Sequence, residues 1–180
     1  GLPKLINNIS LFVLKIVTSE NETNAGMEIT LREITAKTVR DFCDIRVHSD
    51  QAAYVASNAE SIAQAYFHPE AWFRGIYAGD EPVGFVMIED WTQVSGSDPN
   101  EPICLWRFMM DQRYQGLGYG KRALELVVDH IRSRDKLGYF LTSCVEGEHS
   151  PKPFYLKFGF FETGEILEGE TILRYDLEKE

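Results

Sequence analysis

The sequence ICLWRFMMDQRYQGLGYGKRALELVVDHIRSR, residues 103–134, decides how the rest of the chain is arranged. Its opening apolar run predicts a strand, and the apolar spacing after Lys121 predicts a long amphipathic helix. Between them stand glycines at alternate positions, Gly116, Gly118 and Gly120. A backbone without Cβ atoms can approach a ligand closely, and the free amides and positive dipole end of a helix favour a phosphate group. We therefore predict an anion site at the start of this helix.

The spacing of the glycines narrows the kind of anion site. The dinucleotide fingerprint G-x-G-x-x-G does not fit, because the glycines here alternate strictly. The P-loop pattern also fails, since Gln115 and Arg122 stand where it needs glycine and serine or threonine. A turn without a ligand would rarely contain three glycines, because each one costs backbone entropy. Neither nucleotide motif explains this turn.

The pattern that does fit is Arg113-x-x-Gly116-x-Gly118, which resembles the Q/R-x-x-G-x-G/A signature of the GNAT family, the acetyl-CoA-dependent N-acetyltransferases. The resemblance implies that acetyl-CoA is the cosubstrate and that residues 115–121 hold its diphosphate, largely through backbone N–H groups. It also implies that the pantetheine arm lies between strands 103–110 and 139–145, which separate at their C-terminal ends. By this resemblance the residues that bind acetyl-CoA are Phe108, Met109, Met110, Arg113, Gln115, Gly116, Leu117, Gly118, Tyr119, Gly120, Lys121, Glu148 and Lys157.

A second motif, PFYLKFGF at 153–160, resembles a late helix of the same family, whose usual run is F/L-Y-x-K-x-G-F. The resemblance implies that Tyr155 is the general acid that protonates the departing CoA thiolate. A phenol can do this because its ordinary pKa of about 10 is only somewhat above that of a thiol. The alternative is that Tyr155 packs within an aromatic cluster. Glu148 and Pro151 stand where the family usually has Asn and Ala. The absence of this Asn affects one polar contact to the pantetheine arm and does not change the expected reaction class.

The group that deprotonates the acceptor amine is marked less clearly. Glu89 and Asp90, at the end of a predicted strand, are the nearest candidates by layout, and the alternative is that both are solvated charges at a strand end. Cys144 invites a covalent acetyl-cysteine hypothesis. It has no recognisable histidine partner and is interpreted as a core residue.

The acceptor is predicted from a wider resemblance. Stretches 54–58, 84–87, 105–111 and 113–121 are similar to the bacterial spermine/spermidine (diamine) acetyltransferase branch of the family. This implies direct transfer of an acetyl group to a primary amine, with a polyamine as the favoured small-molecule substrate. Against it, Trp106 stands at a position that is acidic in some polyamine acetyltransferases. An amino acid, a peptide N-terminus or an aminoglycoside are alternative acceptors, and a non-catalytic acyl-CoA-binding module is the alternative from a different class.

The composition indicates a single domain. At 180 residues with 44% hydrophobic content, the chain can bury one full core. A net charge of −10 and a pI near 4.9 argue against a nucleic-acid or membrane surface and suit a cationic partner. Cys43, Cys104 and Cys144 lack C-x-x-C spacing and the four histidines lack metal-ligand spacing, so we expect reduced thiols, a cytoplasmic location and no metal. We also expect a homodimer.

Residues 1–26 are predicted to be an N-terminal extension or a remnant of tag removal, ahead of a GNAT domain over 27–180. The apolar run 11–14 is too short for a transmembrane helix, and no small-residue cleavage site follows it, so it is a poor signal peptide. Docking of this run on the domain surface and docking on a partner subunit both stay open.

The remaining pattern predicts an α/β fold with a central mixed, twisted sheet of about six to seven strands, flanked by about four helices. The expected strands are 29–34, 72–78, 82–91, 103–110, 139–145, 160–166 and 171–177, and the expected helices are 35–49, 52–66, 121–132 and 154–158. This order, β-α-α-β-β-β-α-β-α-β-β, is also the one that GNAT proteins use.

Overall fold

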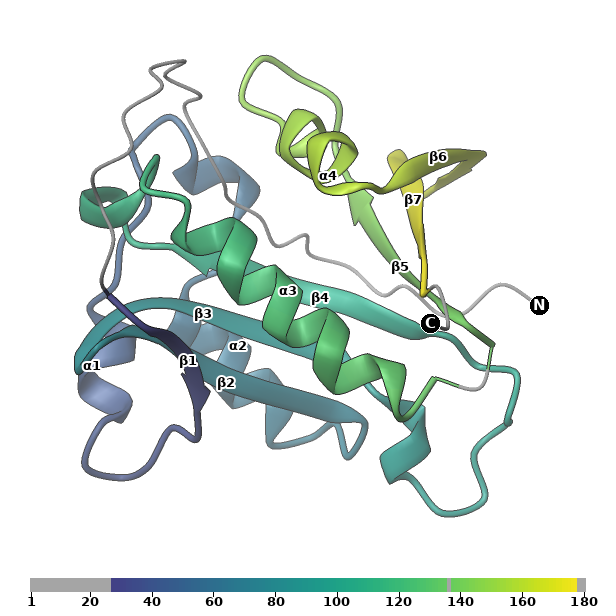
Figure 1. The fold of residues 1–180 in the computed structure, drawn as a ribbon, viewed down its shortest axis with the longest axis horizontal. Helices are drawn as coiled ribbons and strands as arrows, with labels where there is room; N and C mark the ends of the chain where they lie inside the picture. Colours follow the sequence, from purple (N-terminus) through teal and green to yellow (C-terminus); the bar gives the residue numbers. More distant parts are fainter. Residues whose placement is uncertain (1–26, 136, 178–180) are drawn as a thin grey trace.

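A seven-stranded mixed sheet forms the centre of the molecule (Figure 1). The computed structural model describes residues 27–135 and 137–177, and the predicted extension 1–26 lies outside them. In space the strands follow the order β1-β2-β3-β4-β5-β7-β6, and only β4 and β5 run parallel. Their bounds are β1 (Ile29–Arg32), β2 (Ala71–Ala78), β3 (Glu81–Glu89), β4 (Ile103–Met110), β5 (Tyr139–Cys144), β6 (Phe161–Leu167) and β7 (Glu170–Asp176). The predicted fold class and order of elements are confirmed.

Four α-helices of the described chain cover the two faces of the sheet. They are α1 (Val39–Cys43), α2 (Asn58–Ala65), α3 (Tyr119–Arg132) and α4 (Lys152–Phe158), and the loops contain the 3₁₀ turns η1 (Ala52–Tyr54), η2 (Trp91–Gln93) and η3 (Gln112–Tyr114). In Figure 1, α3 crosses the near face of the sheet, and α1 and α2 lie behind it. The last helix, α4, lies beside β5 to β7.

The two faces of the sheet carry separate apolar clusters. The face under α3 holds Ile88, Leu105 and Phe108, among others, against the buried stripe of that helix. The opposite face holds Phe42 of α1 with Met87 and neighbouring strand residues. Because alternate strand residues point to opposite faces, Met87 and Ile88 define the two sides of β3. Figure 1 shows which helices each side meets.

The first two helices are shorter than predicted. Segment 35–49 is helical only at α1, and segment 52–66 contains η1 and α2, separated by an extended Val55. The Ser57 hydroxyl accepts a hydrogen bond from the Glu60 N–H at 3.2 Å, and it therefore starts a new helix at Asn58. Local capping thus divides a stretch whose apolar spacing suggested one continuous helix.

The third strand ends at Glu89 instead of continuing to Trp91 as predicted. The Asp90 carboxylate accepts a hydrogen bond from the Thr92 N–H at 3.1 Å and caps η2. This cap turns the chain away from the sheet directly after Glu89.

Strands β4 and β5 separate after a short parallel contact, as predicted. Within the described chain they pair only at Ile103 with Phe140 and at Cys104 with Leu141. The next link is a side-chain bond, in which Thr142 Oγ1 donates to the Leu105 carbonyl at 3.4 Å. Beyond Cys104 the described chain contains no further β4–β5 backbone pair, and β4 leads into the glycine turn.

Candidate active site

The glycine turn presents a row of unpaired backbone donors at the head of α3. None of the backbone N–H groups of residues 115–121 donates to an acceptor in the described chain, and the first to do so is that of Arg122, to the Gly118 carbonyl at 3.2 Å. Gly116 and Gly118 have φ angles of +80° and +82°, which residues with a Cβ rarely adopt. No acidic residue stands in the first turn of α3. The turn can therefore bind an anion through its backbone.

Side chains next to the turn fix its shape. The Arg113 guanidinium donates to both carboxylate oxygens of the buried Asp111, at 3.0 and 2.9 Å, and this bond raises its pKa above the ordinary value. The Gln115 Nε2 donates to the Met110 carbonyl and to Gln51 Oε1, both at 3.1 Å. Leu117, Tyr119 and Lys121 lie at least partly exposed along the turn, with Lys121 3.9 Å from a carboxylate oxygen of Glu125.

The C-terminal half of β4 is buried and held by β3. Phe108, Met109 and Met110 pair with Val86, Phe85 and Gly84. A Cβ on Gly84 would lie 2.5 Å from the Met109 carbonyl oxygen, so only glycine lets the two strands approach this closely. These three residues lead from the point of strand separation to the glycine turn.

A β-bulge in β4 was not foreseen from the sequence. Met87 pairs with Arg107 and Ile88 pairs with Leu105, so Trp106 has no partner in the β3 register. Bulges re-aim side chains and are common next to active sites. This one lies just beyond the last β4–β5 pair.

Arg107 is the largest fully buried side chain of the site, and sequence reasoning missed it. Its Nε donates to Ser61 Oγ at 3.2 Å and its Nη2 to Gln64 Oε1 at 3.0 Å, which ties β4 to α2. Burial lowers the pKa of this guanidinium to about 10, while Glu60, Glu170 and Glu89 oppose the fall. An arginine in the middle of an apolar strand was the available signal, because a buried charge needs partners.

Tyr155 lies fully buried on α4. Its ring packs 5.5 Å from the ring of Phe154 and 5.1 Å from that of Phe160, so the aromatic cluster considered for it exists. Its hydroxyl oxygen is also enclosed and makes no hydrogen bond in the part of the chain described. Burial raises the pKa of this phenol well above the ordinary value, and the side chain of Thr142 on β5 opposes the rise. The hydroxyl keeps its proton at neutral pH.

Glu89 and Asp90 are not the solvated strand-end charges considered above, and that interpretation is wrong. Their side chains are enclosed, with 5% of Glu89 and 0% of Asp90 exposed. Asp90 accepts from Arg134 Nη1 at 2.7 Å and from Thr92. Glu89 differs, because its Oε2 is buried without a hydrogen bond from any described residue. Burial raises the pKa of Glu89 to about 7.

Two of the residues predicted to bind acetyl-CoA lie on the protein surface. Glu148, in the loop after β5, and Lys157, on α4, are exposed. Cys144 is buried, and burial raises the pKa of its thiol to about 11, which disfavours a thiolate nucleophile. No cluster of potential metal ligands occurs in residues 27–135 and 137–177, and no helix there could cross a membrane.

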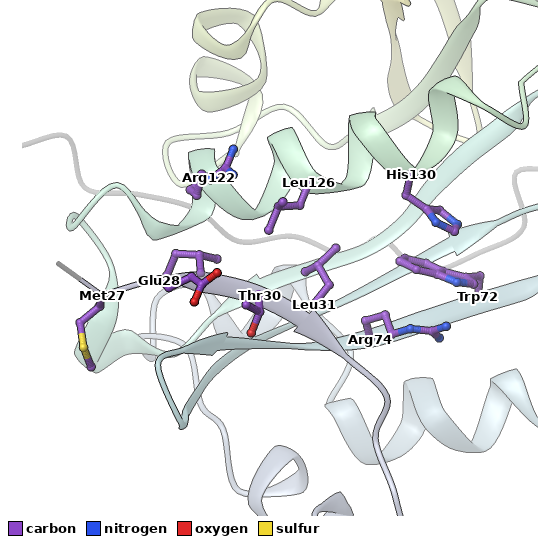
Figure 2. A pocket seen from close by; sticks show the side chains of 10 residues that line it. Met27, Glu28, Thr30, Leu31, Trp72, Arg74, Arg122, Leu126 and His130 are labelled. Carbon is purple, nitrogen blue, oxygen red and sulfur yellow. The ribbon is translucent and has the colours of Figure 1, made fainter. Parts of the chain in front are cut away.

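A separate cavity of about 810 Å³ lies between β1 and α3 (Figure 2). Its helix wall consists of Arg122, Leu126 and His130, one face of α3, and the His130 ring stacks on Trp72 with centroids 4.0 Å apart. None of the residues predicted to bind acetyl-CoA lines it. The cavity is therefore distinct from the turn at the head of α3.

Comparisons with known proteins agree with this geometry. The model of the Acetyltransferase (GNAT) family matches residues 37–160. The spermine/spermidine N(1)-acetyltransferase of Bacillus subtilis (strain 168) is 28% identical over 156 residues, which cover 84% of this chain and 100% of that protein.

Solved structures share the fold at low sequence identity. Aminoglycoside 6'-acetyltransferase type Ii gives a TM-score of 0.64 at 16% identity, covering 86% of this chain and 99% of that one. PaiA N-acetyltransferase from Thermoplasma acidophilum, solved in complex with coenzyme A, gives 0.59 at 17% identity, covering 83% and 99%.

Proposed function

Because the chain belongs to the GNAT acetyltransferase family, we propose that this acetyl-CoA-dependent N-acetyltransferase acts on a primary amine of a polyamine such as spermidine or spermine. The observation that carries the acyl-CoA part of the proposal is the row of N–H groups at residues 115–121 that donate to no acceptor among the described residues. A diphosphate offers oxygen acceptors to such a row, and the dipole of α3 adds a favourable field.

The signature at the turn also fits in a second register, Gln115-x-x-Gly118-x-Gly120. Gly118 is the N-cap of α3 and Gly120 lies buried in its first turn. We favour this later register for diphosphate binding. The Arg113 side chain is already paired with Asp111 and contributes by shaping the turn.

The transfer step uses the region where β4 and β5 separate. Main-chain groups of residues 108–110 bind the pantetheine arm, and the backbone near the bulge polarises the acetyl carbonyl, as an oxyanion hole does. The amine nitrogen forms a bond to the carbonyl carbon, the carbon–sulfur bond breaks, and the Tyr155 hydroxyl gives its proton to the departing sulfur. A fully buried phenol that retains its proton supports this role.

A cationic acceptor suits the acidic residues that influence Arg107. Glu60 on α2, Glu89 on β3 and Glu170 on β7 all act electrostatically on Arg107. The whole chain also carries a net charge of −10. An ammonium group would be attracted to these carboxylates. The name of the Bacillus subtilis relative supports the polyamine class.

An acceptor screen tests the proposal. Release of free CoA from acetyl-CoA is measured with spermidine, spermine, an aminoglycoside, a free amino acid and a peptide N-terminus. We expect the highest kcat/KM with the polyamines. Turnover only with another amine would overturn the polyamine assignment, and CoA binding without release for any amine would favour a binding module.

A further inference from the structure

Glu89 is the last residue of β3 and lies level with the point where β4 and β5 part. It pairs with Cys104, and Cys104 is the last β4 residue that pairs with β5. Since Ile88 packs against the α3 face, Glu89 points to the opposite face, together with Met87. That face carries α2 and the Arg107 side chain. Figure 1 shows β3 directly beside β4 along this length.

The Glu89 carboxylate lacks the partners that a buried charge normally has. Its Oε2 is enclosed without a hydrogen bond, and no ion pair involves Glu89 in the described chain. Buried carboxylates are normally paired or hydrogen-bonded, because an uncompensated charge is costly. An enclosed carboxylate without these bonds has a free oxygen for a proton.

Burial, and after it the neighbouring charges, raise the pKa of Glu89 and make it a stronger base than an ordinary carboxylate. Glu70, before β2, and Glu101, before β4, disfavour its ionised form, and Arg107 favours it. The Cys104 thiol on β4 feels the Glu89 charge in turn. Glu70 Oε1 is already hydrogen-bonded to His68 Nδ1 at 2.8 Å. Asp90 is tied to Arg134 and Thr92 and is excluded as an alternative.

We propose that Glu89 is the general base of the reaction, accepting the proton that the acceptor ammonium must lose before its nitrogen attacks. The inference depends on the acetyl transfer proposed above. The proton passes from nitrogen to a Glu89 oxygen, directly or through one bridging water. The free amine then forms the nitrogen–carbon bond, the carbon–sulfur bond breaks, and Tyr155 protonates the sulfur. Solvent exchange returns the proton from Glu89 and restores the one lost by Tyr155.

The test is the pH dependence of kcat/KM for the wild type and Glu89→Gln, with the best amine from the acceptor screen. The wild type should lose activity as the pH falls through about 7, because protonated Glu89 cannot accept a proton. Glu89→Gln should be about 100-fold slower at pH 7.5, in the usual range for loss of a general base. Its deficit should shrink toward pH 9.5, where more of the amine is already deprotonated.

Glu70→Gln is the matched control, since it neutralises a neighbouring buried carboxylate. Removing this repelling charge should move the acidic limb of the wild-type profile to lower pH and leave the plateau within threefold. CoA affinity measured by calorimetry and the thermal midpoint are compared for all three proteins. The Glu70→Gln shift remains decisive if Glu89→Gln does not fold.

The outcomes separate the two proposals. If the wild type turns over, two results would each overturn the assignment of Glu89 alone. One is a Glu89→Gln variant with the same pH profile within threefold, and the other is a Glu70→Gln profile without a shift. A wild type that releases no CoA with any amine would overturn acetyl transfer itself, and this inference with it.

Discussion

At the residue scale, burial decides which polar groups of the site are available for chemistry. The carboxylates of Asp90, Asp111 and Glu70 are enclosed and already bonded to Arg134, Arg113 and His68. We therefore interpret them as structural residues. The oxygens Tyr155 Oη and Glu89 Oε2 are enclosed without such bonds. Unsatisfied buried polar atoms are few in folded proteins. We therefore propose that these two oxygens, among the few such atoms of the described chain, act on the substrates.

Replacing Tyr155 by Phe tests the general acid. The ring packs against Phe154 and Phe160, and Phe preserves that packing while removing an oxygen that bonds to no described residue. We expect kcat to fall about 100-fold, within the range for a lost general acid, with little change in CoA affinity. Single-turnover kinetics and calorimetric titration with CoA measure the two quantities. Equal losses in both would indicate a packing role.

At the element scale, the local pattern predicted β4, the glycine turn and α3 well. The spacing of Ala123, Leu124 and Val127 marks the buried face of α3, and the order of helices and strands along the chain follows from short-range signals. The shortened helices could not be predicted in this way, because the Ser57 cap competes with the apolar spacing of 52–66. The burial of Glu89 and the bonds of Arg107 to α2 depend on contacts between distant segments, which a local pattern does not contain.

Arg107→Met should loosen α2 from β4. The change keeps an unbranched apolar stem and removes the bonds to Ser61 and Gln64, leaving those groups without that donor. We expect the free energy of unfolding to fall by about 2 kcal/mol, as for other broken buried polar contacts. The KM for the amine should rise more than the Kd for CoA, because we propose that the acceptor binds near Arg107 and α2.

Arg132→Met is the control for that measurement. Arg132 forms an exposed pair with Asp129 at 3.2 Å, and such pairs contribute about 0–1 kcal/mol. Urea unfolding of both variants compares them directly. An Arg107→Met protein as stable as Arg132→Met would contradict the positioning role of Arg107.

At the scale of the whole molecule, we propose that the protein is a homodimer formed through β6. This strand is one edge of the sheet, and edges with unpaired backbone groups readily bind another chain. Its Phe161 and Ile166 side chains are 45% and 74% exposed. Exposed apolar side chains on a sheet edge are typical of an interface between subunits.

Light scattering after size exclusion should therefore give about twice the chain mass of 20.6 kDa. Ile166→Lys should shift the protein toward the monomer, because a charge there disfavours burial. Tyr66→Lys is the control. Tyr66 is 85% exposed and lies at the end of α2, not on β6. Weak dimers form at a protein concentration of about 100 μM. A wild-type protein that is still monomeric at this concentration would contradict the proposal.

The most direct measurement is a calorimetric titration of CoA into the wild type, Gly118→Ala and Gly96→Ala. Both glycines have φ near +80°, at +82° and +80°, and an added Cβ would meet no atom within 4 Å at either position. Each substitution therefore adds a similar backbone strain of roughly 1–2 kcal/mol. Of the two glycines, only Gly118 lies in the turn that we propose binds the diphosphate. We predict that Gly118→Ala raises the Kd for CoA at least about tenfold, or about 1.4 kcal/mol, while Gly96→Ala leaves it unchanged. Equal affinities in all three proteins would contradict diphosphate binding at residues 115–121.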